Sequence, residues 1–578
     1  MAKQKKSEVR RAAGVLAPII PILALISCVV NVLALTGSFY MLQIYDRVLS
    51  SRSIPTLIAL SVLAVSLYLF QGGLEIVRSQ VLVRIASRLD RQLTTMTHDA
   101  VVRLRSFVGS QASPMQPLRD VDAIRSFLSG QAPVAILDMP WMPLYLGFVF
   151  LLHPVLGWAT SAGALFLISL TLLTERLMRA PSEASSGASR QRWTLAEASE
   201  QNAEVLNAMG FAHRFMRRFQ SASHDYLAAN ERLSDIVGCL TVVSRVFRLM
   251  LQSALLGLGA YLTISGEMTA GAIIACSIAA SRALAPIEVA IANWRGFVAA
   301  RQAAYRLEAI FASLPKRSKP LLLQPPTSGL SIEGLAGAVP GTQTITLSNI
   351  TFAVKAGAVV AVIGPSAAGK STLARAITGV WPLARGAVRL DGAAHSSWSP
   401  EELGKHVGYL PQDVQLFDGT ITENISRFEE NPDSLKVITA SQMACVHEMV
   451  LRLPNGYETR IGTGGSVLSA GQRQRIALAR ALYGNPFLVV LDEPNSNLDS
   501  DGEAALIKAI EGVKARGGIV IVIAHRPSVL GAADTVAVIG GGQLTAIGPK
   551  DEILRKVLRY PVTAPAALAV TADAKAQG

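Results

Sequence analysis

The apolar residues in the first half of the chain gather in six long runs separated by polar segments. These runs cover about residues 15–41, 56–73, 133–152, 155–173, 236–264 and 269–291. A helix needs roughly 20 apolar residues to cross the hydrocarbon core of a bilayer. The pattern therefore predicts six transmembrane helices. The third and fourth turn at His153-Pro154, and the fifth and sixth turn at Gly266-Glu267.

Charge fixes the orientation of these helices. Only 16% of the residues are charged, against about 25% in soluble domains. The net charge of +13 raises the question of nucleic-acid binding. However, arginines crowd the two long segments after runs two and four, whereas Arg47 and Arg52 are the only Arg or Lys in the opposite loops. Positive charge marks the cytoplasmic side. We therefore predict a multi-pass protein of a lipid bilayer, with both termini cytoplasmic and no nucleic-acid partner.

The pattern changes after the sixth run. A stretch rich in lysine, arginine and proline at 316–329 predicts a linker, and strand-length apolar runs then alternate with helical patterns, as in α/β domains. We divide the chain into a transmembrane domain with cytoplasmic helical extensions (1–315), this linker, a second domain (330–562) and an alanine-rich tail that we predict to be disordered (563–578). Polar breaks near Asp120–Ser126 and Asn207–Arg214 are interpreted as extension tips that contact the second domain; solvated loops are the alternative.

The second domain carries a phosphate-binding motif. The apolar strand Ala358–Ile363 leads directly into a loop of the form G-x-x-x-x-G-K-[ST], in the strand–loop–helix context that this motif requires. Its glycines let backbone N–H groups approach phosphates, and the helix N-terminus adds positive potential. We predict that Lys370 reaches the β- and γ-phosphates of ATP and that Ser371 binds Mg²⁺. The predicted ATP-binding residues are Gly364, Pro365, Ser366, Ala367, Ala368, Gly369, Lys370, Ser371 and Thr372.

A second apolar strand, Phe487–Leu491, ends in two acidic residues. We predict that Asp492 holds Mg²⁺ through water and that Glu493 is the general base that polarises the attacking water. The alternative, that the two acids only end a strand, is weakened by the phosphate-binding loop. The sequence thus predicts an α/β P-loop NTPase domain fused to the helical bundle.

Further motifs resemble those of ABC transporters. Leu468–Arg475 (LSAGQRQR) resembles their signature motif, Gln412 their Q-loop glutamine, Ser496–Asp499 their D-loop and His525 their switch histidine. The resemblance implies catalytic roles for Gln412 and His525 and a contact of Gln412 with Mg²⁺. It also implies two ATP molecules between the ATPase domains of a homodimer. The further nucleotide contacts that it implies are Ser469, Gly471, Gln472 and Asp499.

Two positions depart from the family pattern. Ala470 replaces the usual glycine of the signature motif, which places a methyl group toward the facing nucleotide. Val339 stands where the family usually has an aromatic residue that stacks on adenine. No residue is therefore assigned to adenine stacking.

The membrane half resembles a narrower group. Segments Tyr40–Leu49, Leu137–Pro143, Leu152–Pro154 and Arg282–Arg295 resemble those of type I secretion exporters, in the protease- and lipase-secreting branch. This implies an ABC exporter of the bacterial inner membrane that couples ATP hydrolysis to export of an unfolded polypeptide with a C-terminal signal. It also implies a periplasmic membrane-fusion adaptor and an outer-membrane channel as partners. About 15 residues without cysteine or histidine precede the first run, so we expect the cargo to keep its signal uncut.

Two alternatives stay open. A half-size ABC exporter of lipids or small hydrophobic molecules shares the same motifs. A non-transporting ATPase of DNA repair or translation also shares the ATPase motifs, but six apolar runs argue against it. Charged residues inside the runs either line the export path or pair between helices; they are Arg245, Arg248, Arg282 and Glu288.

Overall fold

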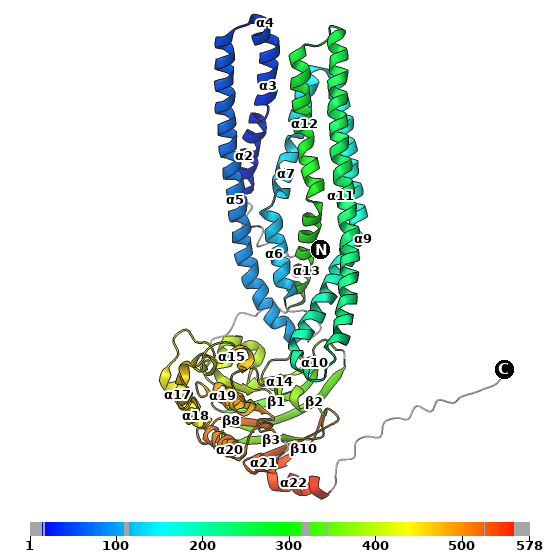
Figure 1. Ribbon diagram of the computed structural model, residues 1–578. Coiled ribbons are helices and arrows are strands. Elements are labelled where there is room, and N and C mark those ends of the chain that lie inside the picture. The colour runs from blue at the N-terminus through cyan, green and yellow to red at the C-terminus, as the bar shows by residue number, and fades with distance from the viewer. Residues whose placement is uncertain are drawn as a thin grey trace, which may run out of the picture. The chain divides into compact units, whose positions relative to one another are not determined.

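The computed structural model describes residue 14 and residues 18–108, 115–314, 323–342, 344–524 and 526–559 (Figure 1). The chain divides into two compact units, the first comprising residues 1–102 and 113–314 and the second residues 103–112 and 315–578. The first is helical, and the second combines helices with two sheets. The predicted tail and the first half of the predicted linker, residues 316–322, lie outside the described residues.

Six helical segments of the first unit are long and apolar enough to cross a membrane, among the residues that the structure describes. This confirms the six predicted spans. The first span is built from α2 (Ile20–Leu33), α3 (Thr36–Gln43), the π-helical turn η1 (Ile44–Val48) and α4 (Leu49–Ser51). The second lies in α5 (Ile54–Val108), and the third comprises α7 (Ala132–Asp138), η3 (Met139–Trp141) and α8 (Met142–Leu152). The last three lie in α9 (Pro154–Gln201), α11 (Ala212–Ile264) and α12 (Ala270–Ala292).

The polar extensions continue these helices. Helices α5, α9 and α11 have 55, 48 and 53 residues, more than twice what a bilayer requires. α9 and α11 run side by side (Figure 1). Between them lies α10 (Ala203–Ala208), and Gly210 then adopts φ +66°, so the predicted break near Asn207–Arg214 is confirmed.

The predicted break near Asp120–Ser126 is wrong. Those residues lie inside one helix, α6 (Gln116–Leu128), which buries Asp120, Val121 and Ile124 on one side. Asp120 is 2% exposed and forms hydrogen bonds of 2.9 and 2.7 Å with Arg306 of α13 (Trp294–Ser313). A buried bidentate ion pair thus replaces the expected loop.

Asp46 in η1 caps the start of the sixth span. Its carboxylate accepts hydrogen bonds from the Thr269 hydroxyl (2.7 Å) and from the backbone N–H of Gly271 (2.9 Å). A β-carbon at Gly271 would collide with Asp46 and with the backbone of Leu42. The close approach therefore requires glycine. The carboxylate also complements the N-terminal end of the α12 dipole.

The second unit is an α/β domain with two sheets, as predicted. The six-stranded sheet has the order β10-β9-β3-β8-β7-β6, in which only β10 pairs antiparallel. Its strands are β3 (Val359–Ile363), β6 (Val407–Leu410), β7 (Leu488–Asp492), β8 (Ile519–Ile523), β9 (Thr535–Gly540) and β10 (Gln543–Pro549). The four-stranded sheet, β2-β1-β4-β5, comprises β1 (Gly329–Ala338), β2 (Ile345–Lys355), β4 (Leu383–Leu390) and β5 (Ala393–Ala394).

Helices pack around the larger sheet of this unit. The main ones are α14 (Lys370–Ile377), α15 (Pro400–His406), α16 (Ile421–Ile425), α17 (Ser434–Met443), α18 (His447–Leu451), α19 (Ala470–Leu482), α20 (Ser500–Ala515), α21 (Pro527–Gly531) and α22 (Lys550–Arg559). Strands β3, β7 and β8 are almost fully buried, which explains their unbroken apolar sequences. Because β3 and β7 both pair in parallel with β8, their carboxyl ends meet at one edge of the sheet.

Candidate nucleotide site

The loop between β3 and α14 depends on two glycines. Gly364 adopts φ +155°, and a β-carbon there would collide with the carbonyl oxygen of Ile539. Gly369 adopts φ +97° and would bring a β-carbon within 2.7 Å of the Leu347 side chain. Both conformations favour glycine. The loop therefore wraps closely around the N-terminus of α14, where free N–H groups can bind an anion.

Lys370 begins α14 and is 5% exposed. Its ammonium donates hydrogen bonds to the carbonyl oxygens of Gly364 (3.0 Å) and Pro365 (2.8 Å). Burial lowers the pKa of Lys370, against the opposing effect of the Glu493 and Asp492 carboxylates. A buried cation whose hydrogen-bond partners among the described residues are two backbone carbonyls fits a site for phosphate oxygens.

Asp492 ends β7 and is fully buried. One of its oxygens accepts a hydrogen bond from the Ser371 hydroxyl (3.1 Å), whereas Oδ2 has no partner among the described residues. Burial raises the pKa of Asp492, although the Ser371 hydrogen bond and the nearby Arg375 and Lys370 charges favour ionisation. An unpartnered buried carboxylate oxygen next to a serine hydroxyl is a fitting donor set for a hard divalent cation.

Glu493 follows with φ +49°, and its N–H donates to the carbonyl of Ile523 in β8 (3.1 Å). This left-handed turn directs the side chain away from the strand, because a residue continuing β7 would point into the core. The Gln412 amide donates to the Glu493 carboxylate (3.0 Å). Two of the three predicted catalytic residues, Gln412 and Glu493, therefore meet at the edge of the sheet where β7 ends.

These groups surround a cavity of about 420 Å³. The predicted residues that line it are Ser366, Ala367, Gly369, Lys370, Ser371, Thr372, Gln412 and Glu493. Thr346 of β2 also lines it and was not predicted, because no motif precedes it in the sequence. Val339 is 37% exposed and does not belong to the described lining.

The signature residues lie elsewhere. Ser469 is the N-cap of α19 and forms a capping box with Gln472. Ala470 follows it and is exposed, and Gly471 is packed closely against the backbone of Asn497. None of these residues lines the described cavity.

Asp499 and His525 are also predicted site residues. Asp499 is the N-cap of α20 and accepts from the Gly502 N–H (2.8 Å), so its carboxylate stabilises that helix start. His525 lies outside the described residues.

Comparisons with known proteins agree with this geometry. A family model for ABC transporters matches residues 347–496, and one for the ABC transporter transmembrane region matches residues 20–284. The chain is 53% identical over 533 residues to the type I secretion system ATP-binding protein PrsD of Rhizobium meliloti, across 92% of each chain. The chain belongs to the ABC transporters of type I secretion systems.

More distant relatives extend the likeness of this ABC transporter. It is 27% identical over 540 residues to the alpha-hemolysin translocation ATP-binding protein HlyB of Escherichia coli, across 92% of this chain and 75% of that protein. Its fold is similar to that of a bacterial Atm1-family ABC exporter solved with ATP bound, with a TM-score of 0.80 and 22% identity, across 94% and 97% of the two chains. The predictions of an ATP-binding, ATP-hydrolysing transporter in the membrane are confirmed.

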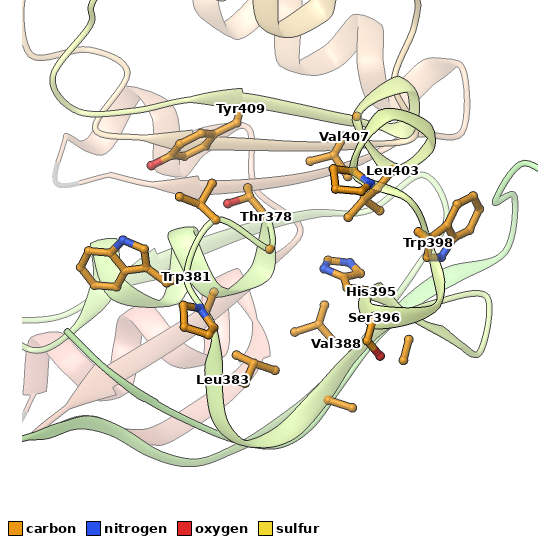
Figure 2. A pocket seen from close by; sticks show the side chains of 18 of the residues that line it. Thr378, Trp381, Leu383, Val388, His395, Ser396, Trp398, Leu403, Val407 and Tyr409 are labelled. Carbon is orange, nitrogen blue, oxygen red and sulfur yellow. The ribbon is translucent and has the colours of Figure 1, made fainter. Parts of the chain in front are cut away.

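A second, larger cavity of about 630 Å³ lies in the ATPase unit of this transporter (Figure 2). Figure 2 shows His395 within it, between Val388 and Leu403, with Trp398 on one side. The imidazole nitrogens of His395 and the indole nitrogen of Trp398 have no partner among the described residues. Burial lowers the pKa of His395 to about 4. His395 therefore stays neutral at physiological pH.

The membrane unit of the transporter holds two clusters of paired charge. Asp138 at the end of α7 accepts hydrogen bonds at one oxygen from Arg78 (2.8 Å), Asn31 (2.8 Å) and Ser27 (3.1 Å). Arg248 and Glu288 form an ion pair of 2.6 Å between α11 and α12. The first cluster was not predicted, because Asp138 lies 60 residues from Arg78 and 107 and 111 residues from Asn31 and Ser27. The second agrees with the alternative that intramembrane charges pair between helices.

Proposed function

We propose that this chain is the energy-coupling permease of a type I secretion system. It exports an unfolded polypeptide, which carries a C-terminal signal, across the bacterial inner membrane. The observation that carries the proposal is the 53% identity to a type I secretion ATP-binding protein across 92% of each chain. The alternative of a lipid exporter has no comparable support, because the Atm1-family likeness is at 22% identity and concerns the fold.

The nucleotide chemistry follows from the cavity between the two sheets. Residues Gly364–Thr372 bind the phosphates of ATP. The Lys370 ammonium, which donates to the carbonyl oxygens of Gly364 and Pro365 in this structure, donates to phosphate oxygens when ATP is bound. Ser371, Asp492 and Gln412 hold Mg²⁺, which neutralises phosphate charge. Glu493 orients and polarises the attacking water, and His525 acts at the γ-phosphate. The support is that Lys370, Ser371, Gln412 and Glu493 line one cavity, and that Asp492 accepts a hydrogen bond from Ser371 at its edge.

The signature residues suggest a homodimer. Ser469, Gly471, Gln472 and Asp499 contribute to the site of the partner chain, with Ser469 and Gly471 opposite Lys370 of that chain. Their position outside the described lining of their own cavity supports this arrangement. ATP binding then closes the dimer and hydrolysis reopens it. The membrane helices respond to both steps.

The orientation and partners complete the proposal. The ATPase unit and both termini lie in the cytoplasm, as the arginine-rich connections indicate. A periplasmic membrane-fusion adaptor and an outer-membrane channel receive the polypeptide. The cytoplasmic extensions and the ATPase unit recognise its C-terminal signal.

Reconstituted secretion tests this function. The chain is expressed with an adaptor, a channel and a candidate cargo, and cargo is measured in the medium by mass spectrometry. We expect full-length cargo with an intact C-terminus, and none when Lys370→Ala replaces the wild type. Secretion that is unaffected by Lys370→Ala would overturn the proposal. So would export of lipid in place of every cargo tested.

A further inference from the structure

A small polar cavity lies inside the membrane unit. It has a volume of about 140 Å³ and is bordered by α2, α5, α7, α8 and α12. Its polar lining comprises Asn31, Gln71, Glu75, Arg78, Gln131, Asp138, Tyr145 and Arg282. Polar groups at this depth are expensive, so they indicate function unless they satisfy one another.

One wall of the cavity is satisfied internally. Arg78, Asn31 and Ser27 all donate to the same oxygen of Asp138. The Tyr145 hydroxyl donates to the side-chain and backbone oxygens of Asn31, both at 2.9 Å. This wall is a closed network that joins the first three spans, and it needs no ligand to satisfy its charges.

The rest of the cavity wall has fewer partners. Arg282 is exposed, and its guanidinium has no ion pair and no hydrogen bond with any residue in the described ranges. Gln71 is 8% exposed and donates to Glu75 (2.9 Å), but its buried carbonyl oxygen has no partner there. The wall thus offers a cation with five N–H donors, an unused amide oxygen and a carboxylate that accepts from one described amide.

Arg282 differs in this respect from Arg78, which is paired with Asp138, and from Arg248, which is paired with Glu288. Arg282 is exposed, so water can solvate its charge. The carbonyl oxygen of Gln71 is buried and has no partner among the described residues. This buried acceptor, in the same cavity lining as Arg282, marks a place for a ligand that carries a donor.

We propose that this cavity binds the main chain of the polypeptide in transit, one peptide group at a time. Arg282 donates to a peptide carbonyl, and Gln71 and Glu75 accept the peptide N–H. The volume equals roughly four or five water molecules, which fits a main-chain amide and leaves bulky side chains outside. A free carboxylate is a poorer match, because Glu75 and Asp138 line the same space. This inference rests on the proposed secretion function.

Recognition of the main chain has a specific consequence. Every peptide group carries one donor and one acceptor, whatever its side chain. The cavity therefore contacts acidic, neutral and apolar stretches of cargo equally well. Replacing Arg282 should therefore slow the secretion of acidic and of neutral cargo by the same factor.

Photo-cross-linking tests occupancy directly. A cargo that is secreted by the wild-type system is fused at its N-terminus to a tightly folding domain, so that it stalls in the full transporter complex. A photoreactive phenylalanine derivative replaces Ala285 or, in a second variant, Val289, which both line the cavity. We expect ATP-dependent cross-links to the stalled cargo from either position. The same group at Leu165 on α9, which is 69% exposed, is the control and should give none.

A charge comparison tests the recognition mode. Arg282→Gln is expected to slow secretion about tenfold, the scale of one lost charge-assisted hydrogen bond. The fall should be equal for the cargo and for a version with its Asp and Glu residues replaced by Asn and Gln. Arg245→Gln, which removes an exposed arginine of α11 outside the cavity, should have little effect. Rates are divided by the amount of transporter in the membrane.

Each outcome decides the inference separately from the function. Secretion by the wild type without cross-links from residues 285 and 289 would overturn main-chain binding and leave the secretion function intact. So would an Arg282 effect that disappears with the neutral cargo, which would show binding of acidic side chains. An equal effect of Arg245→Gln would show a general effect of positive charge and would also overturn the inference. Absence of wild-type secretion would instead overturn the proposed function.

Discussion

Asp492 in the ATPase unit, which is fully buried, and Asp138 in the membrane unit, which is partly buried, each lie at the end of a regular element, but they differ in their partners. Asp492 receives one hydroxyl and keeps a buried oxygen without a partner among the described residues. Asp138 receives an arginine, an asparagine and a serine. The difference separates two uses of buried charge. A buried carboxylate oxygen without a partner indicates a ligand site, whereas a carboxylate that accepts hydrogen bonds from several helices holds those helices together.

The comparison predicts the largest effect at the incompletely paired site. Glu493→Gln removes the proposed general base, and general base catalysis contributes about 10²–10⁴ in rate. We expect steady ATP hydrolysis by the purified transporter to fall by about that factor. ATP binding should persist, because the phosphate-binding loop is unchanged. Phosphate release and nucleotide binding measured on the same sample check this prediction, and near-normal turnover would contradict the assignment.

A change at Asp138, which accepts three hydrogen bonds, should alter the stability of the membrane unit. Asp138→Ala leaves Arg78 buried without its acid, a change that costs about 3–5 kcal/mol in comparable pairs. We expect a lower thermal unfolding midpoint of the membrane unit in detergent. The double variant Arg78→Met/Asp138→Leu should recover most of the loss, because it removes both charges. Equal loss in the single and double variants would show that the charge pair is not the cause.

His395 in the ATPase unit is a buried group without a partner among the described residues, but it is neutral, unlike Asp492. Its pKa is lowered to about 4 by burial, whereas an unfolded histidine titrates near 6.5. This pKa difference contributes to the free energy of unfolding of the ATPase unit, and the contribution is fully present above pH 6.5. It declines as the pH falls toward 4, because the unfolded chain then binds a proton that the folded unit does not. The full effect is up to about 3 kcal/mol.

Chemical unfolding of the whole transporter between pH 7 and pH 4 measures this slope. His395→Leu should flatten it. His447→Gln, which replaces a histidine that contacts the Tyr457 hydroxyl at 2.8 Å, should not. A slope that His395→Leu leaves unchanged would exclude His395 as its source.

The smallest expected effect concerns adenine. Val339 lies just after β1 and is partly exposed. Base–aromatic stacking is worth about 1–3 kcal/mol in other nucleotide sites. Val339→Tyr should therefore tighten ATP binding at least about fivefold if the residue reaches the base. Titration with ATP measures this, and Val339→Leu controls for added bulk. Unchanged affinity would place the base elsewhere.

Local sequence predicted the nucleotide site well, because its motif is contiguous. The residues from Gly364 to Thr372 sit between one strand and one helix, and their backbone conformation is dictated by glycines inside the motif. The six spans were equally predictable from apolar length alone. In both cases neighbouring residues carry the whole signal.

Contacts between distant residues were beyond such reasoning. Asp120 reads as part of a polar break, but it faces Arg306, 186 residues later, and is buried. Thr346 reaches the nucleotide cavity only because β2 passes beside the phosphate-binding loop. Arg78 and Asp138 lie 60 residues apart. Such partners depend on tertiary packing, which a single sequence does not display.

The Asp46 contact limits how the membrane unit can open. Separating the π-helical turn from the start of the sixth span would break two hydrogen bonds and strip the cap from a helix of 23 residues. Gly271 leaves no room for a side chain beside Asp46 and the Leu42 carbonyl, so the first span and the start of the sixth are in direct contact here. The Asp46 cap therefore ties the first span to the start of the sixth at this end.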